Sequence, residues 1–140
     1  MSAKYFIDTN VFVYSFDNRH LSKRDRSKEL IQEALKTGTG IISTQVIQEF
    51  LNVATQKFVV PLKIEDGKAY LRLVMNPLCH VYPSLALYES CLDIQAETKY
   101  SFYDSLIIAA AAQSHCDILY SEDLQNGQEV RGVNIVNPYR

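Results

Sequence analysis

Short apolar runs alternate along the chain with longer segments in which apolar residues recur every three or four positions. The short runs are typical of buried strands and lie at residues 4–8, 40–43, 78–82, 117–121 and 133–136. The longer segments predict helices at residues 11–16, 22–36, 44–54, 64–74, 84–99 and 101–112. Thr44 is expected to cap the third helix, and Asn76-Pro77 is expected to follow the end of the fourth.

This alternation predicts parallel strands joined by right-handed crossovers, with helices on both faces of the sheet. We expect a three-layer α/β/α sandwich around a central parallel sheet of about four to five strands. The helix at residues 101–112 is apolar on nearly every side and is therefore expected to be central. With 140 residues, no repeats and no linker-like segment, the chain is expected to form a single domain over residues 1–140.

The composition is that of an ordinary globular protein, with 47% hydrophobic and 21% charged residues. The longest apolar stretch, residues 106–112, is much shorter than the roughly 20 residues that a bilayer span needs. The start of the chain, Met-Ser-Ala-Lys-Tyr-Phe, lacks the apolar core of a signal peptide. We therefore expect a cytosolic, cytoplasmic protein that does not act at a membrane.

Cysteine usage indicates a reducing compartment. Cys79, Cys91 and Cys116 form an odd, widely spaced set in apolar surroundings, which suits reduced thiols in a core better than a disulfide framework. Cys79-His80 and His115-Cys116 could form two halves of a zinc site, but the paired ligand spacing of known zinc motifs is missing. Core packing is the favoured interpretation.

The formal net charge of −2 argues against a protein that coats nucleic acid non-specifically, because such proteins usually carry a strongly basic face. This charge does not exclude a nuclease, since acids that bind divalent cations lower the formal charge while the occupied site attracts phosphate. No glycine-rich phosphate-binding loop follows a predicted strand, so a nucleotide cofactor has little support.

Four carboxylates stand where packing alone does not require them: Asp8, Glu49, Asp104 and Asp123. Asp8 ends an apolar strand, where its charge needs a cation or hydrogen-bond donors, although Asp8 or Asn10 could simply cap the next short helix. Asp104 lies on a helix with almost no polar face, although it would also suit the third helical position behind an N-cap at Ser101.

The other two acids have similarly plain alternatives. Glu49 lies at the margin of its helix's apolar face, where most glutamates are solvated. Asp123 follows a strand in a position common for turn-forming acids, and its neighbour Glu122 could take its place. Ser121 could orient a ligand or a metal-bound water, or only bond nearby backbone. Four converging carboxylates would repel one another, and Mg²⁺ or Mn²⁺, which prefer oxygen ligands, would relieve that repulsion.

The chain resembles the PIN-domain nucleases in the order and spacing of its acidic motifs. These motifs are Asp8-Thr9-Asn10 after the first strand, Glu49 within a helix, Asp104 in Phe-Tyr-Asp-Ser-Leu-Ile-Ile-Ala-Ala-Ala, and Ser121-Glu122-Asp123 after a strand. Within that family the chain is most similar to the VapC-type toxin ribonucleases of toxin–antitoxin modules. The resemblance implies that Asp8, Glu49 and Asp104 ligate metal, and that Asp123 completes the pocket directly or through water. Asn10 and Ser121 match supporting polar positions, and Glu122 remains an alternative to Asp123.

The activity implied by the resemblance is that of a Mg²⁺- or Mn²⁺-dependent endoribonuclease. A metal-activated water would attack an RNA phosphodiester in line and leave 5′-phosphate and 3′-hydroxyl ends. Lowering the pKa of bound water would supply the nucleophile near neutral pH without a histidine base. A small antitoxin protein and a second copy of the chain in a homodimer are the partners that the resemblance implies.

Two other functions remain open. A phosphatase that forms an aspartyl phosphate on Asp8 would also use a strand-end acid and Mg²⁺. It is the weaker interpretation, because many such phosphatases carry a second acid where this chain has Asn10, and no strand-end lysine is evident. A catalytically idle PIN-like module that binds RNA or a protein is the non-enzymatic alternative, and the intact set of acids speaks against it.

A basic segment at residues 19–28 follows the first strand and short helix closely. Lys23, Arg24 and Arg26 could contact RNA phosphates or an acidic partner. A solvated helix start, softened by Asp25 and Glu29, is the favoured alternative.

Two aromatic side chains also follow Asp8 closely. Tyr14 and Phe16 could stack on unpaired bases, although burial in the core is the commoner fate of such residues.

Overall fold

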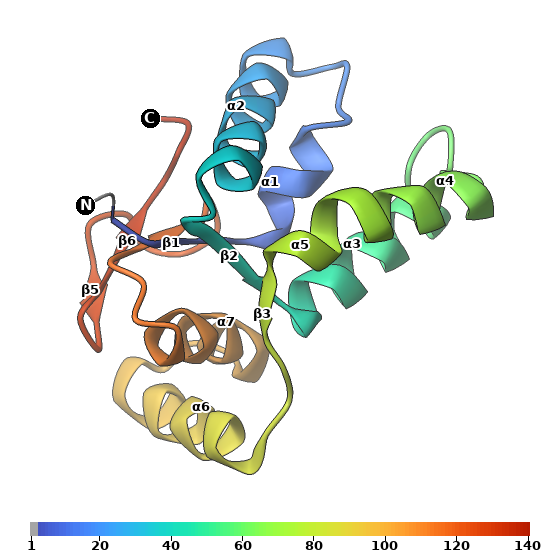
Figure 1. Ribbon diagram of the computed structural model, residues 1–140. Helices are drawn as coiled ribbons and strands as arrows, with labels where there is room; N and C mark the ends of the chain where they lie inside the picture. The colour runs from blue at the N-terminus through green and yellow to red at the C-terminus, as the bar shows by residue number, and fades with distance from the viewer. Residues whose placement is uncertain (1–2) are drawn as a thin grey trace.

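A six-stranded sheet with the order β3-β2-β1-β4-β6-β5 runs through the centre of the molecule in this computed structural model, which describes residues 3–140 (Figure 1). The strands are β1 (Tyr5–Ile7), β2 (Gly40–Ser43), β3 (Cys79–Val81), β4 (Ile118–Tyr120), β5 (Glu129–Val130) and β6 (Val133–Val136). Five of them run parallel, which confirms the predicted architecture, and β5 pairs antiparallel with β6 at one edge. The sequence did not indicate β5, because two residues are too few to show an alternating pattern.

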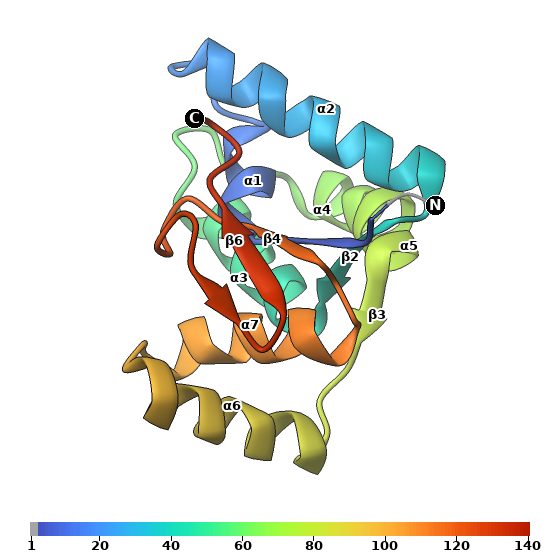
Figure 2. The same ribbon diagram turned by 90° about the vertical axis from the view of Figure 1, so that its left-hand side faces the viewer.

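Helices cover both faces of this sheet (Figure 2). They are α1 (Thr9–Tyr14), α2 (Leu21–Thr37), α3 (Thr44–Gln56), α4 (Ile64–Tyr70), α5 (Asn76–Leu78), α6 (Leu85–Thr98) and α7 (Phe102–Gln113). One face is covered by α2, and the other by α7, with α6 packed on the outer side of α7. Every residue of α7 from 105 to 111 is buried, which confirms the central position predicted for this helix.

Serine side chains set the start of two helices as the sequence indicates. The Ser84 hydroxyl accepts a 3.1 Å hydrogen bond from the N–H of Leu87 at the start of α6, and Ser101 accepts one of 3.1 Å from the N–H of Asp104. Helix α3 differs from the prediction, because its N-cap is Ser43 rather than Thr44. The Ser43 hydroxyl makes no capping hydrogen bond.

The helix predicted to end before Asn76-Pro77 continues to Leu78, so this predicted boundary is wrong. A π-helical turn, η1 (Leu71–Met75), connects α4 to α5, and the N–H of Asn76 donates to the Leu71 carbonyl five residues back. Pro77 lies in the first turn of α5, directly after this π-helical turn. The wider turn therefore lets the chain remain helical through a proline.

The close approach of α2 to β2 depends on Gly40. A Cβ atom at this position would lie 2.3 Å from Cβ of Ala34, so any side chain would push the helix off the strand. The three cysteines are buried and free, as expected for core thiols. Within residues 3–140, no helix is long and apolar enough to cross a bilayer. The predicted lack of a signal peptide rests partly on Met1 and Ser2, which lie outside the described residues.

Candidate active site

Asp8 lies where β1 ends and α1 begins, so it holds both positions that its sequence context predicts. Its backbone N–H donates to the Tyr120 carbonyl at 3.1 Å, and its side chain is the N-cap of α1. The carboxylate is buried and accepts two 2.7 Å hydrogen bonds, from the Thr9 N–H to Oδ1 and from the Ser121 hydroxyl to Oδ2. The carboxylate is therefore fixed in place by both β1 and β4.

The electrostatic environment of Asp8 disfavours its ionised form. Burial raises the pKa of Asp8 to about 6. The hydrogen bonds from Ser121 and Thr9 lower this pKa, and the negative charges of Glu49 and Asp123 raise it further. Carboxylates from three separate elements thus act on one another at this edge of the sheet.

Glu49 is positioned from two directions on the inner side of α3. The Thr9 hydroxyl donates to Oε1 of Glu49 at 2.6 Å. The Gln45 amide nitrogen lies 3.4 Å from Oε2 and also donates to the Tyr103 carbonyl at 3.1 Å. Sequence reasoning missed Thr9 and Gln45 as supporting residues; the one available signal was the spacing of Gln45, one helical turn before Glu49.

Asp104 and Asp123 lie at the open side of the same region. Asp104 is half-buried in the first turn of α7, where the hydroxyl of Ser101 caps its N–H. The Asn10 amide donates to Oδ2 of Asp123 at 2.5 Å. Burial raises the pKa of Asp123, the hydrogen bond from Asn10 lowers it, and the charges of Glu122 and Asp104 raise it further. This mutual influence links Asp104 to the group formed around Asp8.

The two adjacent acids after β4 have different surroundings. Glu122 accepts a 2.6 Å hydrogen bond from the Tyr14 hydroxyl and a 2.6 Å ion-paired hydrogen bond from Nζ of Lys23. Burial raises the pKa of Glu122, but the bonds from Lys23 and Tyr14 outweigh that effect and leave the pKa below its usual value. Glu122 is therefore neutralised by α1 and α2, whereas Asp123 is bonded to Asn10, two residues after Asp8.

The donor chemistry at this edge suits a hard divalent cation, because every candidate ligand is a carboxylate oxygen. Burial first, and then the charges of neighbouring acids, raise the pKa values of Asp8 and Asp123. Among residues 3–140, no three His, Cys, Asp or Glu side chains stand close enough to hold a metal ion as placed. The structure thus brings the four acids to one region without closing them into a complete set of ligands.

The basic segment is engaged in contacts within the chain. Lys23 pairs with Glu122 and lies over the ring of Tyr14. Arg24 donates to the side chain of Asn18 and pairs with Asp25. Arg26 pairs with Glu29 and donates to the Pro138 carbonyl, so each of the three cations already has a partner. These pairs match the solvated, charge-balanced helix start that the sequence favours.

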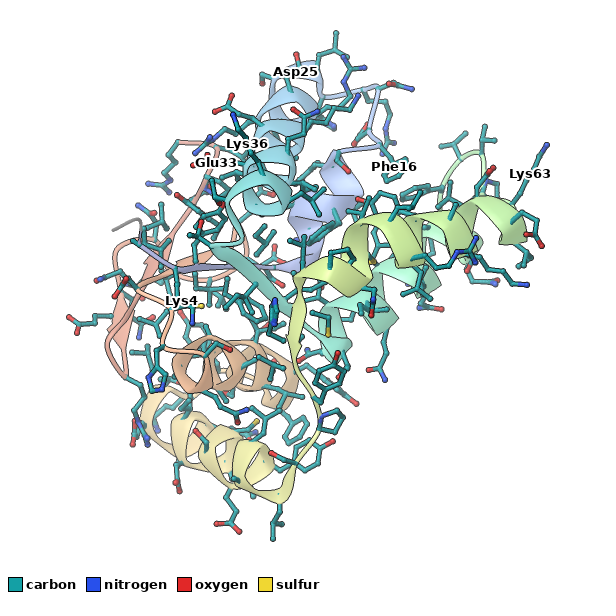
Figure 3. The ribbon with its side chains drawn as sticks, in the orientation of Figure 1. Lys4, Phe16, Asp25, Glu33, Lys36 and Lys63 are labelled. Carbon is teal, nitrogen blue, oxygen red and sulfur yellow. The ribbon has the colours of Figure 1, made fainter. Side chains whose placement is uncertain are left out.

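The two aromatic residues after Asp8 also take different places. Tyr14 bonds Glu122 beside the carboxylate region. Phe16, which is labelled in Figure 3, lies beyond the end of α1. Its ring packs against the rings of Phe50, Phe58 and Tyr70. Phe16 is therefore part of an aromatic cluster.

The fold and this grouping of acids define a class of parallel α/β protein with a carboxylate site beyond the carboxyl ends of β1 and β4. The family model described as PIN domain matches residues 5–126. The chain belongs to the PIN domain family.

Several solved structures share this fold. A toxin–antitoxin complex from Klebsiella pneumoniae has a TM-score of 0.70 at 20% identity, covering 99% of this chain and 98% of that one. DNA-bound VapBC from Salmonella typhimurium has a TM-score of 0.64 at 20% identity, covering 96% and 97%. VapC20 of Mycobacterium tuberculosis, a sarcin–ricin loop-cleaving toxin, has a TM-score of 0.61 at 21% identity, covering 86% and 90%. No curated protein sequence matches this chain.

Proposed function

We propose that this protein is a Mg²⁺- or Mn²⁺-dependent endoribonuclease. The observation that carries the proposal is the buried carboxylate of Asp8, held by Ser121 and Thr9 with the charges of Glu49 and Asp123 acting on it. A buried acid with other acids around it is costly unless a cation or a proton compensates the charge. Membership of the PIN domain family and the likeness of the fold to an RNA-cleaving toxin support the same conclusion.

In this proposal, Asp8, Glu49 and Asp104 hold the metal, and Asp123 completes the site directly or through water. When bound there, Mg²⁺ or Mn²⁺ would lower the pKa of a water near neutral pH and offset charge on the phosphate. Ser121 and Thr9 act as positioning residues, because they fix the carboxylates of Asp8 and Glu49.

The biological role we propose is that of the toxin in a toxin–antitoxin pair, acting in the cytoplasm. Structures with this fold include a toxin–antitoxin complex and VapBC assemblies, which supports a small antitoxin protein as the partner. A homodimer is part of the same proposal.

A cleavage assay on a labelled single-stranded RNA tests the enzymatic proposal. We expect cleavage with Mg²⁺ or Mn²⁺, none with EDTA, and recovery when the metal is added back. The Asp104→Asn variant should keep the fold, as judged by circular dichroism, and lose at least about 100-fold in rate. Metal-independent cleavage, or an unchanged rate in this variant, would contradict the proposed mechanism. A folded chain that binds RNA without cutting it would instead favour the idle binding module.

A further inference from the structure

A cavity of about 360 Å³ adjoins the carboxylate site between the start of α3 and the helices α6 and α7. The side chains that matter in its wall are Ser43, Gln45, Tyr88, Phe102, Tyr103 and Leu106. Two of these residues also belong to the carboxylate region. Gln45 bonds Glu49 and the Tyr103 carbonyl, and Tyr103 directly precedes Asp104. A ligand in the cavity would therefore lie next to the acids.

Two residues that line this cavity each carry a buried polar atom with no hydrogen-bond partner. They are the hydroxyl of Ser43, a residue with 3% of its surface exposed, and Oε1 of Gln45, with 7% exposed. Ser43 occupies the N-cap position of α3, where a serine hydroxyl usually bonds the helix backbone, and it does not do so here. Buried polar atoms cost free energy unless something pairs with them, so a polar ligand that entered this cavity and reached the two atoms would relieve that cost.

The chemistry of its neighbours fixes the orientation of the Gln45 amide. Its nitrogen faces the Tyr103 carbonyl and the Glu49 carboxylate, and both of these groups are hydrogen-bond acceptors. Turning the amide over would place its oxygen against two other oxygens. The unpaired atom of Gln45 is therefore an acceptor, and a ligand that reached it would have to supply an N–H or O–H donor.

We propose that this cavity binds a nucleobase of the RNA, in the nucleotide beside the bond that is cut. The inference rests on the proposed ribonuclease function and names the part of the substrate that binds in this cavity. Tyr103 is 64% exposed and Tyr88 is 40% exposed, so aromatic rings are available at the cavity for stacking. Each RNA base also carries an N–H donor beside an acceptor on its pairing edge, which suits Gln45 Oε1 and the Ser43 hydroxyl. An apolar peptide side chain would fill the space but leave both polar atoms unpaired.

Titration of the isotope-labelled chain with adenosine, cytidine, guanosine and uridine tests the inference by NMR in EDTA. Nucleosides have no phosphodiester bond, so their binding is independent of metal and cleavage. We expect at least one nucleoside to shift the side-chain amide of Gln45 and the ring signals of Tyr103 in a saturable way. Ser43→Ala should lower the affinity for that nucleoside by about fivefold, because one hydrogen bond is lost. Tyr103→Ala should lower the same affinity by roughly tenfold or more, because the stacking contact is lost.

Ser105→Ala is the matched control for Ser43→Ala. Ser105 is fully buried and its hydroxyl also has no partner, but it does not line the cavity. This variant should bind the nucleoside as the parent chain does. Equal weakening in both serine variants, or no shift at Gln45 with any nucleoside up to its solubility limit, would overturn the inference.

A parallel titration with N-acetyl-leucinamide separates the competing occupant. Shifts at Gln45 and Tyr103 with this peptide mimic, and none with nucleosides, would assign the cavity to a protein side chain and reject the nucleobase. The outcomes for the two proposals also remain distinct. Nucleoside binding in a chain that never cleaves RNA rejects the nuclease alone, and cleavage without nucleoside binding rejects the base pocket alone.

Discussion

The Ser121 hydroxyl donates a 2.7 Å hydrogen bond to Oδ2 of Asp8 from the neighbouring parallel strand. The contact follows from strand register, because Ile7 of β1 lies opposite Tyr120 of β4 and the next residue of each strand is the polar one. Parallel pairing therefore brings a carboxylate and its hydroxyl donor together at the edge where both strands end.

Replacing Ser121 with alanine should raise the pKa of Asp8 above about 6, because the lost hydrogen bond stabilised the ionised carboxylate. The acidic limb of the cleavage rate against pH should move to higher pH, and the free energy of unfolding should fall by about 1 kcal/mol. Ser114→Ala is the control, since the Ser114 hydroxyl donates to the Ala110 carbonyl at the C-terminal end of α7. The assigned role of Ser121 fails if both variants have the same pH profile.

The metal-free protein should be stabilised by Asp8→Asn above pH 6. The pKa of Asp8 rises from 3.8 in the unfolded chain to about 6 on folding, so the folded state binds the extra proton between these values. Stability from this group is therefore greatest below pH 3.8 and is lost as pH rises to 6. The loss approaches about 3 kcal/mol, of which a weakened hydrogen bond in the variant offsets about 1 kcal/mol.

Urea denaturation in EDTA at pH 4, 6 and 8 measures this effect. We expect a gain of roughly 2 kcal/mol for Asp8→Asn at pH 8 and little or no gain at pH 4. A parent chain that is more stable than the variant at pH 8 would show that burial of the charge is compensated by something else.

The adjacent acids Glu122 and Asp123 should respond differently to removal of their charge. Asp123→Asn should lower the cleavage rate at least about tenfold, because the side chain belongs to the carboxylate region. Glu122→Gln loses a partly exposed ion pair with Lys23, which should cost less than about 1 kcal/mol of stability. Its cleavage rate should stay within about twofold of the parent rate. A large loss of cleavage rate in Glu122→Gln, with little change in Asp123→Asn, would show that Glu122 is the fourth acid of the site instead.

Thr9→Val should weaken metal binding by about tenfold with little change of shape. The substitution removes the hydroxyl that donates to Oε1 of Glu49 at 2.6 Å, so this carboxylate loses its orientation. Calorimetric titration with Mn²⁺ measures the affinity. Thr55→Val serves as the control, because its hydroxyl bonds the Leu51 carbonyl on α3 instead. Equal Mn²⁺ affinity in the Thr9 variant and the parent would remove Thr9 from the site.

The sequence was sufficient to predict the parallel sheet, because each buried strand is short, apolar and followed by a helical period. The same pattern places Asp8 and the segment 121–123 at strand ends, and parallel strands end on one edge. The π turn before Pro77 was not predictable in this way. It depends on how the widened helix packs, whereas the local pattern of Asn76-Pro77 is that of a break.

Supporting contacts in the site were harder to predict than the acids themselves. The Thr9 hydroxyl and Glu49 are 40 positions apart, and only the packing of α1 against α3 brings them together. Glu122 and Asp123 are equivalent in sequence, and their difference comes from the tertiary placement of Lys23 and Tyr14 around only one of them. The pattern of polar and apolar residues along the chain predicts neither arrangement.

The central place of β1 has a consequence for synthesis of the protein. This strand is made first, yet it is flanked by β2 and by β4, which is formed by residues 118–120. While a ribosome is still translating the chain, Asp8 has neither Ser121 to hold it nor Asp123 nearby. An enzyme with the proposed activity would therefore have its site assembled only after residues 121–123 have been made, and we expect fragments that end before β4 not to cleave RNA.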